Sequence, residues 1–347
     1  MLGGGVFITQ NKVLPGSYIN IVSAATLTSA LGERGVVAIA LPIGKEAGEV
    51  FELTANDFVQ NCETTLGVKY SDNKVIALRE IFRHATKVYL YDTGAEAAKT
   101  VSEVCSALEP YEFNVLCAYT NIANDITAYI AQVKTWRDEM GKKCQLVVYN
   151  TSTADYEGVV NVVSTVSEDG VDAFGLVAWV AGAQAGCAVN KSCTNMIYDG
   201  EYTVMVNKTQ KELEDCLGAG QFVFHNVYGS VRVLEDINSL TTTTADKNDD
   251  FKNNQTIRVI DQVANDIAKL YNTKYLGKIQ NNASGRESLW GEIVAHHREL
   301  ERVMAIENFN SDELKVDRGT TKTSVVVTDA ITPVNCMARL YMTIVVQ

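Results

Sequence analysis

Lys87-Val88-Tyr89-Leu90-Tyr91 opens the stretch of sequence that decides the fold. This run is short, apolar and rich in β-forming residues, and two similar runs follow at 113–118 and 145–149. The segments between them carry apolar residues at helical spacing, and Asn121 is the expected cap of the second helix. Strands that alternate with helices form crossover units, so this stretch predicts an α/β domain with a doubly wound parallel sheet.

The pattern continues with a fourth expected strand at 159–163 and a helix at 171–188. Residues 173–190 form 18 uncharged positions and include Gly182-x-x-x-Gly186, which is the length and packing motif of a membrane helix. Gln184 and three glycines lower the hydrophobicity of this stretch, so we predict a buried helix of the α/β core instead. The first residues carry no basic segment, and we expect no secretory signal.

The last third of the sequence has a different pattern. Apolar stripes predict helices at 257–271 and 286–305, and β-runs are expected at 323–328 and 337–347. A Thr-, Asp- and Asn-rich loop at 241–254 precedes them. The predicted organisation is an N-terminal arm (1–22), an outer α/β domain (23–235), a C-terminal α+β domain (236–320) and C-terminal strands or an arm (321–347).

The composition of the 347 residues is that of a globular protein, with 46% hydrophobic residues and a net charge of −12. Nucleic acid is disfavoured as the main partner, because phosphate binding requires clustered Lys and Arg. The charge is uneven, with −10 over residues 1–235 and −2 over residues 236–347. The eight cysteines include no C-x-x-C pair, so we expect reduced core residues of a protein made in the cytoplasm.

A search for catalytic motifs finds no phosphate loop, no G-x-S-x-G and no H-E-x-x-H. The expected carboxyl ends of the strands, such as 92–94, are polar, which fits either a small-ligand site or ordinary helix caps. His296 and His297 are adjacent and therefore diverge on a helix, so with Glu292 and Glu299 they predict a polar helix face. We expect no catalytic residue, cofactor or metal site, and the alternative function is a small-molecule-binding enzyme on a Rossmann-like layer.

Both ends of the chain are apolar and strand-like, although chain ends are normally polar. Residues 337–347 alternate between two faces, and similar runs at 6–9 and 17–21 are joined around Pro15-Gly16. An exposed apolar strand must pair with something. These strands either close the chain's own sheet or act as arms that complete a sheet in a neighbouring subunit. The candidate arm residues are Val6, Phe7, Ile8, Tyr18, Ile19, Leu340, Tyr341, Met342, Ile344 and Val346.

Several short motifs are spread over nearly the whole chain. The first comprises the opening glycines and residues 10–18. The further motifs are Ala178-Trp179-Val180-Ala181-Gly182, Asn190-Lys191-Ser192, Asp236-Ile237-Asn238-Ser239-Leu240, Ile257-Arg258-Val259-Ile260-Asp261 and Tyr275-Leu276-Gly277-Lys278. Each is weak alone, but the set in this order resembles the tail sheath proteins of contractile phages and of R-type phage-tail-like bacteriocins, and the first motif resembles the start of the short sheath subgroup.

The resemblance implies a virion structural protein and no enzyme. Sheath subunits form a helical polymer of stacked hexameric rings around an inner tube, and contraction drives that tube through a target envelope. The implied middle layer is subtilisin-like without protease residues, and terminal arms join the rings. The implied partners are further copies, the inner tail tube protein, and baseplate and tail-terminator proteins, with no membrane insertion and no direct nucleic-acid contact. Assembly is expected in the bacterial cytoplasm, and release as a virion or bacteriocin particle follows lysis.

The same resemblance places the C-terminal region nearest the tube and requires hinges for contraction. On the expected helix 286–305, the candidate tube contacts are Arg298, Glu299 and Arg302, which also fit an ordinary solvated face. The candidate hinges are Pro15, Gly16 and Gly319.

Overall fold

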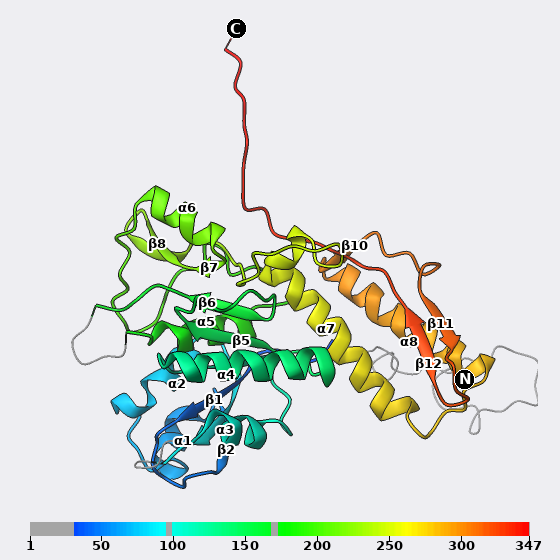
Figure 1. Cartoon of the computed structure of the whole chain (residues 1–347), viewed down its shortest axis with the longest axis horizontal. Helices are drawn as coiled ribbons and strands as arrows, with labels where there is room; N and C mark the ends of the chain where they lie inside the picture. Colours follow the sequence, from blue (N-terminus) through cyan, green and yellow to red (C-terminus); the bar gives the residue numbers. More distant parts are fainter. Residues whose placement is uncertain (1–30, 95–98, 168–172, 347) are drawn as a thin grey trace, which may run out of the picture.

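The structure is a computed structural model that describes residues 31–94, 99–167 and 173–346. At its centre lies a seven-stranded sheet in the order β2-β3-β1-β4-β5-β6-β7 (Figure 1). All neighbouring strands are parallel except β2 and β3, so the predicted α/β fold is confirmed. The strands are β1 Val36–Leu41, β2 Val50–Thr54, β3 Lys87–Asp92, β4 Val115–Cys117, β5 Gln145–Tyr149, β6 Val159–Val162 and β7 Gln221–Phe222.

Helices cover both faces of the sheet because the central strands are apolar on both faces. In β1, Ile39 packs into one apolar layer and its neighbour Ala38 into the other. The first layer contains the helices α1 Phe58–Thr64, α2 Ile76–Ile81 and α5 Leu176–Gly186, and the second contains α3 Val101–Leu108 and α4 Ala123–Lys134.

The uncharged stretch forms α5, which is buried on every side, so the prediction of a core helix is confirmed. Its two glycines are required by close packing. A Cβ on Gly182 would collide with the carbonyl oxygen of Ile81, and one on Gly186 would collide with that of His84. The small residues of this motif therefore bring α5 against the end of α2. Among the described residues, no helix is long and apolar enough to cross a membrane.

The C-terminal part is built on two long helices, α7 Asn254–Leu270 and α8 Ala283–Arg302. Figure 1 shows α7 leaving the sheet domain and α8 lying beside it. After α8, the chain forms two small antiparallel pairs. These are β11 Lys315–Arg318 with β12 Val325–Thr328, and β10 Ile306–Glu307 with β13 Thr332–Pro333. The predicted helices and the predicted β-run at 323–328 match these elements. The π-helical turns η3 Thr135–Glu139 and η5 Tyr271–Tyr275 extend α4 and α7.

The remaining elements are α6 Gln210–Gly218, the hairpin β8 Phe224–Val227 with β9 Ser230–Val233, and two short 3-10 helices. Of these, η2 Asn73–Val75 leads into α2 and η4 Asp249–Lys252 precedes α7.

The predicted cap of α4 is wrong. The N-cap residue is Ile122, whose amide donates to the Thr120 side chain at 3.1 Å, and not Asn121. Helix α3 begins at Val101, where Thr100 forms a capping box with Glu103.

The chain from 337 to 346 is extended and forms no strand in the described structure. Within the described residues, no strand pairs with this segment. Figure 1 shows it leaving the body as a single extension. The runs at 6–9 and 17–21 lie outside the described residues, and the predicted domain bounds stay predictions.

Candidate functional site

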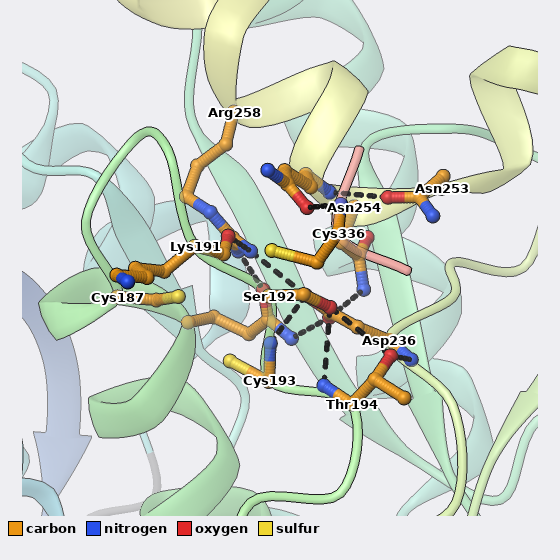
Figure 2. Close-up of polar contacts among 12 residues, drawn as sticks. Cys187, Lys191, Ser192, Cys193, Thr194, Asp236, Asn253, Asn254, Arg258 and Cys336 are labelled. Carbon is orange, nitrogen blue, oxygen red and sulfur yellow. Dashed lines mark hydrogen bonds and ion pairs between the residues drawn. The ribbon is translucent and has the colours of Figure 1, made fainter. Parts of the chain in front are cut away.

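The joint between the sheet domain and α7 is organised by one buried carboxylate, Asp236, which follows β9 (Figure 2). Its Oδ2 lies 2.7 Å from Nη2 of Arg258, which sits on the first turns of α7. The Asp236 side chain is 0% exposed and that of Arg258 is 1% exposed. Two charges taken out of water in this way require mutual pairing and further hydrogen bonds.

The further hydrogen bonds come from three separate segments. The backbone amide of Cys193 donates to Asp236 at 2.9 Å, and the side-chain amides of Gln184 and Asn254 donate at 2.6 and 2.9 Å. Arg258 in turn donates to the Gln184 side chain at 2.6 Å and to the carbonyl of Lys191 at 3.2 Å. Helix α5, the segment after it and α7 therefore meet at one ion pair.

The electrostatics of the joint keep both groups charged. Burial pushes the pKa of Asp236 upward, but the charge of Arg258 and the donated hydrogen bonds outweigh burial, and the pKa lies below its usual value. For Arg258, burial lowers the pKa, but the charge of Asp236 outweighs burial and the net shift is upward. A permanently charged ion pair of this kind is a structural device rather than an acid–base one.

A second buried ion pair fastens α7 less than one turn further along. Arg137 of η3 makes a bidentate contact with Asp261, at 2.6 and 2.8 Å. The Nη1 atom of Arg137, which contacts Asp261, also donates a hydrogen bond to the carbonyl of Cys144 at 2.8 Å. Because α7 is tied at two points to different parts of the sheet domain, the two parts are expected to move as one body.

The root of the C-terminal segment is held by the first turn of α7. The side chain of Gln255 donates to the carbonyl of Val334 at 2.9 Å and accepts from the amide of Cys336 at 3.0 Å, while Asn335 bonds Thr256. Beyond this clamp, Arg339 pairs with Glu235 at 2.9 Å on the surface. The apolar residues that follow, from Leu340 to Val346, are 71–90% exposed.

At the carboxyl end of β3, part of the edge where an α/β enzyme would bind its ligand, the chain pairs with itself. Asp92 ends β3, and its carboxylate accepts backbone amides from Gly44, Lys45, Glu46 and Gly94 at 2.7–2.9 Å. Burial raises the pKa of Asp92, but these four amides outweigh burial and hold the pKa below its usual value. The backbone amides of the loop after β1 could bind an anion, and they already bind the carboxylate of Asp92. This supports the interpretation of the polar strand ends as structural caps.

A pocket of about 470 Å³ lies away from this edge, beside η5 and the start of α8. Lys278, Arg286 and Lys322 are among its lining residues, which include no carboxylate and no histidine. It therefore lacks the two side-chain types, carboxylate and imidazole, that most often form an acid–base pair. The described residues contain no group of three or more His, Cys, Asp or Glu side chains that could hold a metal ion.

The prediction for His296 and His297 is wrong. Both side chains are 0% exposed, and they form no polar surface. Their rings do not diverge, because the two Nδ1 atoms lie 3.3 Å apart. The physical reason is that each ring finds a distant carboxylate, Asp266 or Asp329, which makes burial possible.

The other predicted residues fall into two groups. Arg298 and Arg302 are exposed on α8, where Arg302 pairs with Glu299 at 2.6 Å, and Gly319 starts the turn between β11 and β12. Pro15, Gly16 and the N-terminal arm residues lie outside the described part of the chain. The Asp236–Arg258 joint was not predicted, although Arg258 stands within the apolar pattern of its helix.

Comparison with known proteins gives a consistent picture. The model of the phage tail sheath protein central domain matches residues 93–239, and that of the phage tail sheath C-terminal domain matches residues 246–347. The chain is 31% identical over 259 residues to the phage-like element PBSX protein XkdK of Bacillus subtilis, covering 71% of this chain and 55% of that protein. It is 26% identical to the tail sheath protein of Clostridium phage phiCD119, covering 86% and 84%. The matched part of this chain thus spans about half the length of XkdK.

Solved structures agree with this comparison. The sheath tail protein of Desulfitobacterium hafniense has a TM-score of 0.78 at 26% identity, over 92% of this chain and 96% of that one. The sheath tail protein Lin1278 of Listeria innocua gives 0.78 at 23% identity, over 90% and 94%. The anti-feeding prophage sheath in its contracted state shares the fold, with a TM-score of 0.71 at 15% identity over 96% and 99%.

The mixed α/β body, with an apolar extension rooted on α7, has the fold of a structural sheath protein. The chain belongs to the phage tail sheath family, since two domain models of that family together match most of it.

Proposed function

We propose that this chain is the structural subunit of a contractile tail sheath, polymerising as stacked six-fold rings around an inner tube. Contraction from a metastable extended state drives the tube through a target cell envelope. The observation that carries the proposal is the segment 337–346, whose apolar side chains alternate along an extended and exposed stretch. Membership in the sheath family and the shared fold support the same function.

In this proposal the C-terminal segment is an arm that adds a strand to a neighbouring subunit. Burying Leu340, Met342, Ile344 and Val346 gains about 1.5–3 kcal/mol per side chain. Ordering the segment costs about 1–2 kcal/mol per residue, so the side chains alone leave the arm near break-even. Backbone hydrogen bonds between the added strand and its neighbour, repeated over many copies, supply the remaining stabilisation. The terminal runs around Val6 and Tyr18 are proposed to act in the same way.

Exposed strand edges offer a place for such an arm. The hairpin β11–β12 is two-stranded within the described structure, and Val326 and Val327 of β12 are partly exposed. A strand added to this edge would cover apolar side chains and satisfy free backbone groups at once. The hairpin and the arm are therefore complementary parts of one subunit-to-subunit joint.

The subunit body is proposed to stay rigid while the arms hinge. The buried pairs Asp236–Arg258 and Arg137–Asp261 hold α7 on the sheet domain, which favours rigid-body motion. Pro15, Gly16 and Gly319 remain the proposed hinges. Arg298, Glu299 and Arg302 are proposed to contact the inner tube through weak polar contacts that break during contraction, and baseplate and terminator proteins complete the particle. Assembly is proposed to take place in the bacterial cytoplasm before lysis.

Deletion of residues 340–347 tests this function. We expect the truncated protein to keep the unfolding transition of the full chain, because these side chains touch little of their own body. It should fail to form ordered polymers, as seen by negative-stain electron microscopy. Normal sheaths from the truncated protein would refute the arm. No observation favours the alternative of an enzyme on the α/β layer.

A further inference from the structure

Two adjacent histidines of α8, His296 and His297, form a buried chain of polar contacts that the proposed function does not use. The Nε2 atom of His296 lies 2.9 Å from Oδ2 of Asp266, and the Nε2 atom of His297 lies 2.7 Å from Oδ2 of Asp329. The two Nδ1 atoms face each other at 3.3 Å. The four side chains thus form one continuous series of contacts, in the order Asp266, His296, His297 and Asp329.

This line of contacts fixes the number of protons. A carboxylate oxygen only accepts hydrogen bonds, so both Nε2 atoms carry a proton. If both rings were neutral, two lone pairs would face each other between the Nδ1 atoms; if both were charged, two N–H groups would. Only three protons on the four nitrogens satisfy every contact. We infer that His296 and His297 hold one shared imidazolium charge between two carboxylates, and that this charged pair latches the roots of both terminal segments.

The N-terminal root is attached through Asp266 of α7. The amide of Gly32 donates to both carboxylate oxygens of Asp266 at 3.1 Å. Gln262 reinforces this contact, donating to the carbonyl of Gly32 at 3.2 Å and to Asp266 at 2.8 Å. Gly32 stands four residues before β1 begins at Val36, so the latch holds the chain just before it enters the sheet.

The C-terminal root is attached through Asp329. This residue directly follows β12 and stands five positions before Val334, where the clamp on the first turn of α7 begins. The amide of Val334 also donates to the carbonyl of Ala305, just after α8, at 3.0 Å. Asp329, held by His297, and Val334, held by Gln255, are therefore the two fixed ends of a short connection that leads into the arm.

The surroundings suit a single positive charge. Asp266 faces the pair from α7, Asp329 faces it from the segment after β12, and the ring of Phe309 packs on His297 with centroids 5.0 Å apart. Within the described residues these carboxylates make the ion pairs of the two rings. A buried charge requires such partners, and one imidazolium beside two carboxylates has them. The inference concerns the folded chain alone and does not depend on the proposed function.

Nitrogen-15 NMR of the full chain, labelled at histidine, tests the proton count. The chain has four histidines, and His225→Gln, His296→Gln and His297→Gln assign their signals. At pH 7.5, where an unperturbed imidazole is mostly neutral, we expect one doubly protonated ring shared by the pair and three protonated nitrogens in all. Two neutral rings or two charged rings would overturn the inference.

Hydrogen exchange tests the latch separately. Asp329→Asn keeps the size of the side chain but removes the charge, and we expect the Val334 amide to exchange about tenfold faster. His297→Gln should have the same effect. The Leu146 amide, which donates to Gly158 at 2.8 Å in the central sheet, serves as the internal control and should not change. Unchanged exchange at Val334 in both variants would overturn the latch.

Discussion

Asp236 and Arg258 form an ion pair of 2.7 Å that is sealed from solvent at the point where α7 meets the sheet domain. The two residues come from different parts of the chain and gather α5, the segment 190–195 and the first turn of α7 around them. The same first turn clamps residues 334–336. The rigidity of the body and the position of the arm therefore depend on one joint.

Replacing Arg258 by Met is expected to lower the free energy of unfolding by about 3–5 kcal/mol, because Asp236 would stay buried without its counter-charge. Urea unfolding followed by circular dichroism measures this. The matched control is Arg302→Met, which breaks the exposed pair with Glu299 and should leave stability unchanged. Equal effects of the two variants would contradict the role of the joint.

Acid should unfold the protein partly through Asp92. Folding lowers its pKa, so its contribution to stability is present above the ordinary carboxyl range and is lost as the pH falls through the folded value. Asp92→Asn is therefore expected to be less stable than the parent at pH 7, and the difference should narrow as the pH is lowered. Thermal unfolding between pH 7 and pH 3 checks this, with the exposed Asp246→Asn as control. A difference that stays constant with pH would be inconsistent with this account.

The packing of α5 predicts a steric effect at Gly182. An added methyl group would strike the backbone of Ile81, and overpacking of this kind costs about 1–3 kcal/mol. Gly218 at the end of α6 is the matched helical glycine, because a Cβ there would meet nothing within 4 Å. We expect Gly182→Ala to lower the midpoint of urea unfolding and Gly218→Ala to leave it unchanged or raise it. The opposite order would show that the small residues of α5 do not set its packing.

Substitutions on the two opposite faces of the arm form a matched test of which face is buried on assembly. Ile344 lies on the face with Leu340, Met342 and Val346, whereas its neighbour Thr343 lies on the other face. We expect Ile344→Asp to abolish ordered polymers and Thr343→Asp to retain them, with equal unfolding curves for both monomers. Sedimentation and electron microscopy give the readout. Polymers from both variants would mean that burial of the apolar face does not drive assembly.

Local pattern predicts the parallel sheet, because strands such as Lys87–Asp92 and helices such as α4 each carry their own periodicity. It does not predict the joint, since nothing near Asp236 in the sequence indicates that Arg258 will neutralise it. The same limit explains the error at His296 and His297. Their adjacency and the nearby Glu292 and Glu299 predict a polar face, whereas Asp266 and Asp329, at least 30 residues away, allow them to be buried.

The arm illustrates a further limit. The alternation of residues 337–347 indicates a strand, but a strand exists only with a partner, and the described chain offers none. A pattern within one sequence therefore predicts the need for a partner without identifying it.

Negative-stain electron microscopy of the full chain at high concentration, alone and co-expressed with its inner tube protein, tests the central claim most directly. The account predicts long hollow tubes with a regular helical repeat. Discrete particles of uniform size in both preparations would contradict it.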